Sequence, residues 1–310
     1  MKLLFSIMSF SYLFSALLIF IGITIKSQRL QFYAKIVFFV SFLENLAYFF
    51  YRWQKAGHIP VTDAFTSFVF FVLCIALFQV IFIKKSNGFI ILFSSILISF
   101  TLFGLSIAGF NENIQPLIPA LKSNWLAIHV ITSFLAYAAF SINFLVGLYI
   151  LYSSKLKSDY IISSFFFGIL LSGLFTSIVK YLLNYNILIT GVLIFLLVFG
   201  GLIYFHKPYK PVPKEVLVKP IYIGFPLLTT GIITGSIWAK YAWGGYWSWD
   251  PKEIWSLITW IVYLIYIHYN VKGKSMRFLS YLALIGFVSI MITYLGVNFI
   301  MPGLHSYASK

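Results

Sequence analysis

The stretch WGGYWSWDPKEIW, residues 243–255, gathers residue types suited to binding a flat ligand. Six of the chain's eight tryptophans lie in or beside it: Trp238, Trp243, Trp247, Trp249, Trp255 and Trp260. Two acids and one lysine lie among them, although charged residues make up only 9% of the chain. Indole faces beside a few charges suit a flat apolar ligand with a polar edge, such as haem, a quinone or a polyaromatic lipid. The structural alternative is an aromatic belt, but a belt spreads its indoles over both membrane interfaces.

The five histidines are candidate iron ligands, because neutral imidazole binds haem iron. His129 and His305 each lie near one end of an apolar run, and together they are a candidate pair of ligands on the two faces of one iron. His268 lies on the helix predicted to begin at Asp250, and 18 residues at about 1.5 Å each place it roughly 27 Å further along. If His268 binds haem, there are two separate haem positions; the structural alternative is a histidine whose ring extends to the lipid headgroups. The remaining two, His58 and His206, are interpreted as structural.

The elements that position these residues are predicted to be membrane-spanning helices. Hydrophobic residues make up 61% of the 310, more than a soluble domain can hide from water. Several apolar runs reach the roughly 20 residues that cross a bilayer as a helix. The formal charge of +15 falls in short gaps between these runs, so it indicates membrane topology and no nucleic-acid partner. The single cysteine, Cys74, lies in an apolar run, and the chain has no CxxCH motif.

We predict an all-α, polytopic integral membrane protein of about 8–10 transmembrane helices that forms one domain, residues 1–310. The ten expected spans are 3–25, 34–51, 65–83, 88–110, 126–152, 159–182, 186–205, 220–239, 253–270 and 278–297. The first run is read as a retained helix. Alternate gaps are richer in lysine and arginine, which predicts that these gaps are cytoplasmic. Both termini, His129, His305 and the loop 239–255 then lie outside, and His268 lies near the cytoplasmic end of its span.

The second half of the tryptophan segment has the pattern of a helix start. Asp250 suits the N-cap, Pro251 the first helical position, and Glu253 the position that completes a capping box. Capping is therefore the structural explanation of both acids. Lys252 is a candidate partner for a haem propionate, through charge-assisted hydrogen bonds.

The segment WGGYWSWDPKEIWSLITWIVYLIYIH resembles the tryptophan-rich "WWD" signature of haem-handling proteins in cytochrome c maturation. IPALKSNWLAIHV, GFPLLTTGIITGSIWAKYAWG and GVNFIMPGLHSYA are similar to blocks of the CcsA (ResC) family of the System II pathway. These blocks run from about Arg52 to Ala308. One stretch departs from the family, because GHIPVTDAFTS lacks the usual Tyr-Glu-Ser run after its proline.

The resemblance implies a subunit that presents haem to an apocytochrome c. His268 would bind incoming haem b from the cytoplasmic side, and His129 and His305 would be the axial ligands of reduced haem at the outer loop. Trp243, Trp247, Trp249, Asp250 and Lys252 would contact that haem. The resemblance favours a haem–apocytochrome c ligase that attaches haem to CxxCH through thioether bonds, without assigning a catalytic residue.

The resemblance also implies a CcsB (ResB)-type membrane partner, apocytochrome c, haem and membrane lipid as partners. The membrane would be the bacterial cytoplasmic membrane or the plastid thylakoid membrane. Two alternatives remain open at this point: a haem exporter without ligase activity, and a quinone-binding or lipid-handling membrane protein.

Overall fold

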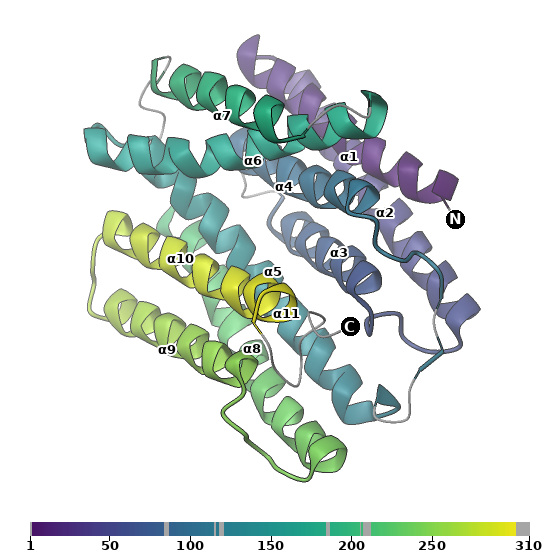
Figure 1. Ribbon diagram of the computed structural model, residues 1–310. Coiled ribbons are helices and arrows are strands. Elements are labelled where there is room, and N and C mark those ends of the chain that lie inside the picture. Colours follow the sequence, from purple (N-terminus) through teal and green to yellow (C-terminus); the bar gives the residue numbers. More distant parts are fainter. Residues whose placement is uncertain are drawn as a thin grey trace. The chain divides into compact units, whose positions relative to one another are not determined.

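The computed structural model describes residues 2–83, 87–114, 116–117, 121–183, 187–204, 206 and 212–301, without the side chains of 183 and 187–190. Within these residues the fold is all-α (Figure 1). The helices are α1 (Lys2–Thr24), α2 (Gln28–Ala56), α3 (Ala64–Phe82), α4 (Gly88–Ile107), α5 (Asn124–Tyr152), α6 (Lys157–Leu183), α7 (Ile187–Tyr204), α8 (Lys214–Trp243), α9 (Pro251–Val271), α10 (Met276–Met291) and α11 (Val297–Phe299), with a π-helical turn, η2 (Ile292–Gly296), between the last two.

Nine helices in the described part of the chain are long and apolar enough to cross a membrane, which confirms the prediction of an all-α polytopic protein. Each of the ten predicted spans coincides with a helix. The span predicted at 186–205 coincides with α7, whose segment Gly191–Tyr204 is a shorter apolar helix. Helices α2 and α8 extend well beyond their predicted spans, because hydropathy marks the segment in hydrocarbon whereas the helix continues to its caps. Those caps are Ser27 and Gly57 for α2, and Gly244 after α8.

The chain forms two compact units, which are described separately. The first comprises Met1–Gln115 and Leu148–Val212. In it α1 packs against α2 and α4, α3 packs against α4, and α6 lies between α4 and α7 (Figure 1). Stacked rings of Phe93 and Phe167, with centroids 3.8 Å apart, join α4 to α6. Our prediction of a single domain over 1–310 stays a prediction.

The second unit comprises Pro116–Gly147 and Pro213–Lys310, and its frame is a bundle of α5, α8, α9 and α10. Two hydrogen bonds show that α5 and α8 are antiparallel, because His129 pairs with Gly231 whereas Asn143, further along α5, pairs with the earlier Leu217. Helix α9 is antiparallel to α8, since Trp260 pairs with Thr229 and Asn270 with Tyr222.

Helices α5 and α9 are therefore parallel, and their contacts keep one register. Phe140 stacks on Tyr263 at 3.6 Å, and the Asn143 amide donates to Tyr266 across the same offset of 123 residues. Helix α10 and the turn η2 that continues it run antiparallel to α9: Thr259 contacts Thr293 of η2 near one end, and Tyr269 contacts Phe278 of α10 near the other. One end of this bundle thus carries the starts of α5 and α9 and the ends of α8 and α11, so it gathers His129 and the tryptophan segment. His268 lies near the opposite end.

Candidate functional site

His129 lies on the second turn of α5 and is held by the backbone of α8. Its Nδ1 lies 2.6 Å from the Gly231 carbonyl oxygen. Because a carbonyl can only accept, Nδ1 carries the proton and donates it, and the neutral ring keeps its lone pair on Nε2. A ring nitrogen fixed in this way by a backbone carbonyl is the usual support of a metal-ligating histidine. His129 therefore has the tautomer and the restraint that an iron ligand requires.

Glycine on α8 makes room for this imidazole. A Cβ added at Gly235 would lie 2.5 Å from His129 Nδ1, and one added at Gly231 would lie 2.5 Å from the Ser133 hydroxyl oxygen. Both distances are too short for any side chain, so the two glycines, one helical turn apart, let α8 approach α5 closely. Sequence reasoning did not assign them a role, although their spacing of four in GIITG was a detectable signal.

Lys252 lies level with His129, on α9. The offset of 123 residues between α5 and α9 pairs the two positions. Lys252 Nζ donates to the Asn298 side-chain oxygen at 2.9 Å, which ties the start of α9 to α11. An ammonium group has three protons, so Lys252 keeps donors for an anionic group while this bond holds it in place. Sequence reasoning did not identify Asn298 as its partner.

The tryptophan segment ends in the predicted capping box. The Asp250 side chain accepts from the backbone of Lys252 at 3.1 Å, and Glu253 Oε2 accepts from the Asp250 backbone at 3.2 Å. The same Glu253 oxygen accepts from both the backbone and the hydroxyl of Ser248, at 2.7 and 3.2 Å. Asp250 is itself buried, so its direct role in this structure is to cap α9 and orient Lys252. Glu253 additionally fastens the loop to the helix that follows it.

The three predicted stacking tryptophans differ in accessibility. Trp249 is 67% exposed, Trp243 is 38% exposed and Trp247 is half-buried. The rings of Trp247 and Trp249 are nearly perpendicular, at 87°, with centroids 5.8 Å apart. Trp249 has a left-handed backbone with φ of +59°, which costs a non-glycine residue about 1–2 kcal/mol. Trp249 is therefore the most available indole of the loop, and it is presented at the cost of backbone strain.

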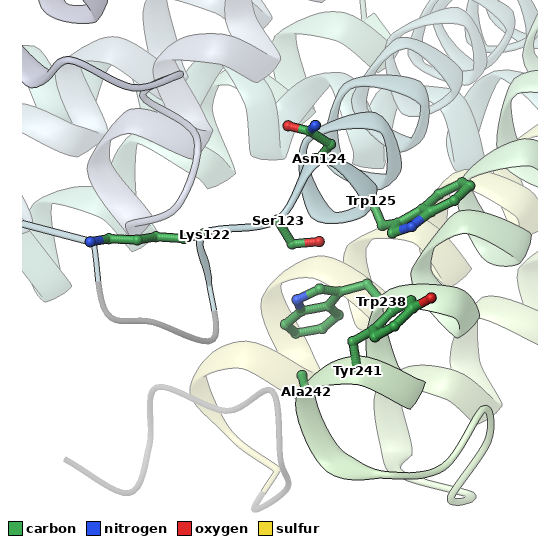
Figure 2. Close-up of a pocket in the computed structure, with 7 residues that line it drawn as sticks. All are labelled: Lys122, Ser123, Asn124, Trp125, Trp238, Tyr241 and Ala242. Carbon is green, nitrogen blue, oxygen red and sulfur yellow. The ribbon is translucent and has the colours of Figure 1, made fainter.

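An open pocket lies beside this loop, between the start of α5 and the end of α8. Lys122, Ser123, Asn124, Trp125, Trp238, Tyr241 and Ala242 line it. Figure 2 shows the rings of Trp125, Trp238 and Tyr241 around the pocket, with Lys122 extending away from them. Trp125 lies one turn before His129 on α5, and Trp238 lies nearly one turn after Gly235 on α8. Aromatic side chains thus extend from the loop to the start of α5, one turn before His129. Sequence reasoning did not assign these residues to the site.

The other histidines are dispersed. His268 is exposed near the end of α9, on a face that it shares with Ile261, Leu264 and Ile265. His206 stacks on Tyr160 at 4.1 Å and hydrogen-bonds the Ser154 carbonyl, and His58 bonds the Ile59 carbonyl. His305 lies outside the described residues, so its pairing with His129 stays a prediction. Among the residues described, no three His, Cys, Asp or Glu side chains cluster to hold a metal ion.

Comparison with known proteins identifies the family. A family model described as "Cytochrome C assembly protein" matches residues 61–305. The "Cytochrome c biogenesis protein CcsA" of Mesostigma viride is 34% identical, over 96% of this chain and 94% of its own length. The proteins of the same name from Guillardia theta and Microcystis aeruginosa are 35% and 34% identical over 83% of the chain, covering 79% and 81% of their own lengths.

The chain belongs to the CcsA family of cytochrome c biogenesis proteins.

Membership of the CcsA family gives the chain a role in cytochrome c biogenesis and makes it a membrane protein that handles haem. The matched region contains every predicted site residue from His129 to His305. It also contains both glycines of α8 that accommodate the His129 ring.

Proposed function

We propose that this CcsA-family protein receives haem b at His268, presents reduced haem at the tryptophan loop, and supports its thioether attachment to the CxxCH of an apocytochrome c. In this proposal the loop and both termini lie on the outer side of the membrane. His129 and His305 are the axial ligands at the loop. Haem is the substrate of this reaction, and the apocytochrome supplies the two thiols.

The observation that carries the proposal is the restraint on His129. Its Nδ1–H is engaged by the Gly231 carbonyl, so Nε2 is the nitrogen available to iron. This imidazole lies at the same end of the bundle as the tryptophan loop. Neither a quinone nor a lipid requires a neutral imidazole held in one tautomer beside indoles, whereas haem iron does.

The residues around His129 supply the remaining contacts that a haem needs. Trp243, Trp247 and Trp249 offer apolar faces, and Lys252 offers charge-assisted hydrogen bonds to a propionate. Asp250 contributes through the cap that orients Lys252. Attachment would be promoted by holding vinyl groups and thiols together, which lowers the entropic part of the barrier. No described side chain is assigned as a general acid or base.

His268 is the proposed receiving ligand on the opposite, cytoplasmic side. It lies 16 residues beyond Lys252 on α9, about 24 Å at 1.5 Å per residue, so it serves a separate haem position. The exposed face of α9 that bears His268 is open to lipid or to another membrane protein. A CcsB-type partner packed there would be able to supply the second ligand of that haem.

We expect His268→Ala to lower both the haem content of the purified protein and the yield of cytochrome c by roughly tenfold or more, because a metal site loses at least this much affinity when a ligand's support is removed. The measurement combines reduced-minus-oxidised spectra with the yield of covalent cytochrome c in cells that supply a CcsB-type partner. His206→Phe is the matched control, since it removes an imidazole but keeps a ring against Tyr160. An unchanged haem content in His268→Ala would contradict the assignment. Haem bound by wild type without any thioether product would instead support an exporter.

The strained backbone of Trp249 permits a test that separates its ring from its conformation. We expect Trp249→Gly to raise the free energy of unfolding, or leave it unchanged, because glycine adopts the left-handed conformation without the steric cost. The same variant should release haem faster, because the most exposed indole is lost. Thermal unfolding and haem dissociation measure the two effects, with Trp53→Gly on helix α2 as the contrasting variant that loses stability without faster haem release. Unaltered haem dissociation in Trp249→Gly would exclude this indole from the platform.

A further inference from the structure

Lys272, the C-cap residue of α9, follows His268 on the same face of the helix. Four residues separate the two, a rise of about 6 Å, and side chains at that spacing are neighbours on a helix surface. Both side chains are exposed. In the other direction the face continues through exposed apolar residues at positions seven, four and three before the histidine, which are Ile261, Leu264 and Ile265. The face therefore presents, in order, an apolar surface, an imidazole and an ammonium group.

The hydrogen bonds that end α9 fix the backbone of Lys272 relative to His268. The Lys272 N–H donates to the His268 carbonyl at 3.0 Å. The next residue, Gly273, has a left-handed backbone with φ of +72°, and the Lys274 N–H then donates back to the Tyr269 carbonyl at 3.1 Å. This is the pattern of a Schellman motif, which closes a helix at a defined residue. Only the side-chain rotamers of Lys272 are therefore left to adjust to a ligand.

Each end of α9 combines a candidate iron ligand with a lysine. At the start of α9, Lys252 lies level with His129, and at the end Lys272 lies one turn beyond His268. The Lys272 ammonium makes no hydrogen bond or ion pair with any residue that the structure describes, so all three of its donors are available. The structural alternative is that Lys272 stabilises the helix dipole and faces anionic lipid headgroups, which requires no histidine one turn before it.

Haem presents the same order of chemical groups as this face. Its ring is apolar, its iron lies at the centre, and its propionates are carboxylates on one edge. Helix α9 also leaves room for a flat ligand along its length. Among the described helices that could cross a membrane it is the least covered, because 17% of its apolar window is buried against 39% or more in each of the others. Charge and polarity along the face thus match haem in one orientation.

We propose that Lys272 binds a propionate of the haem received at His268, with the carboxylate edge toward the end of α9 and the apolar edge toward the middle of the membrane. This inference rests on the function proposed for His268. An ammonium and a carboxylate form a charge-assisted hydrogen bond, which is stronger than a neutral one. At the helix end the carboxylates stay near water, so their charge is not buried in hydrocarbon. Lys272 thereby sets the orientation in which haem enters.

Haem and its dimethyl ester, in which the propionates carry no charge, test the proposal by titration into purified full-length protein. The titrations use the His129→Gly background, which removes the proposed ligand at the other end of the bundle. We expect Lys272→Gln to weaken haem binding by about three- to tenfold, as for an ionic hydrogen bond near water, and to leave the affinity for the ester unchanged. Lys272→Arg should retain the affinity for haem. Added salt should weaken haem binding more in the parent than in Lys272→Gln.

Lys219→Gln is the matched control, because it removes the same charge from a lysine of α8 that is already paired with Glu215 at 3.0 Å. It should bind both ligands as the parent does. An equal loss for haem and ester in Lys272→Gln would overturn the proposal, since the helix end itself would then be responsible. An equal loss of haem affinity in Lys219→Gln would overturn it too, because net charge would explain the effect.

Two further results separate this inference from the function on which it rests. Loss of haem affinity in His268→Ala without any loss in Lys272→Gln would overturn the role of Lys272 alone, and is the result for a lysine held by anionic lipid. Unchanged haem affinity in His268→Ala would instead refute the receiving ligand, and with it the proposed entry of haem at this end.

Discussion

Replacing His129 by glycine should abolish haem retention at the tryptophan loop and the formation of cytochrome c, and free imidazole should partly restore both. The variant removes the ring but leaves the Gly231 carbonyl that orients it. Added imidazole can occupy the same space, donate to that carbonyl and offer its other nitrogen to iron. Because weakening the support of a metal ligand costs 10- to 100-fold in affinity, loss of the ligand itself should cost at least this much.

Rescue by imidazole distinguishes a ligand from a residue that merely supports packing. A cavity left by a structural ring would be filled by imidazole without restoring the reduced haem spectrum. Thr132→Ala is a suitable control, since Thr132 lies one turn away on α5 and its hydroxyl bonds only carbonyls of its own helix. The assignment of His129 fails if the glycine variant keeps the spectrum and haem content of wild type. It also fails if imidazole restores thermal stability alone.

The second large effect is expected from Gly235→Ala, which adds one methyl group at a residue that is not itself predicted to contact haem. Its Cβ would lie 2.5 Å from His129 Nδ1, so either the imidazole or α8 must shift. A displaced ring loses the hydrogen bond to Gly231 and the direction of Nε2. We expect haem affinity to fall by at least about tenfold, in the range for losing the support of a metal ligand. Titration of haem into the purified protein measures it.

Two comparisons isolate the cause of the Gly235→Ala effect. Gly104→Ala on α4 adds the same methyl group within a helix where nothing lies within 4 Å, so it should leave haem affinity unchanged. In the His129→Gly background, Gly235→Ala should lower the haem affinity little further, because two changes that act through one ring are not additive. An equal effect in both backgrounds would show that the methyl group acts on helix packing and not on the imidazole.

Local features of the site were predictable from short stretches of sequence. Asp250, Pro251 and Glu253 specify a helix start through interactions within four residues, and the structure contains that capping box. The spans were predictable because a run of apolar residues has only the helix as a stable form in lipid. Their number and order agree with the helices, apart from the short apolar helix at α7. The separation of His268 from the cap at Asp250 also followed from sequence, since both lie on one helix and the distance depends on its rise.

Contacts between helices were not predictable in this way. The Gly231 carbonyl that orients His129, the glycine that accommodates the ring and the Asn298 amide that holds Lys252 are 102, 106 and 46 residues from their partners. Hydropathy along one chain does not determine which residues of two packed helices lie opposite each other, so these partners were missed. Trp125 was missed for the same reason, although it lies one turn from His129.

The sequence by itself determined an all-α membrane protein, the cap that begins α9, and a family resemblance strong enough to identify the role in cytochrome c biogenesis. Each of these depends on residue types or on neighbours along the chain. Only the tertiary structure decided which nitrogen of His129 is available to iron, because the tautomer depends on an acceptor from another helix. It also decided that α5, α8 and α9 bring His129, Gly235 and Lys252 to one level. The physical reason is that helix direction and register are set by close packing between faces, where glycines permit contact and larger side chains prevent it.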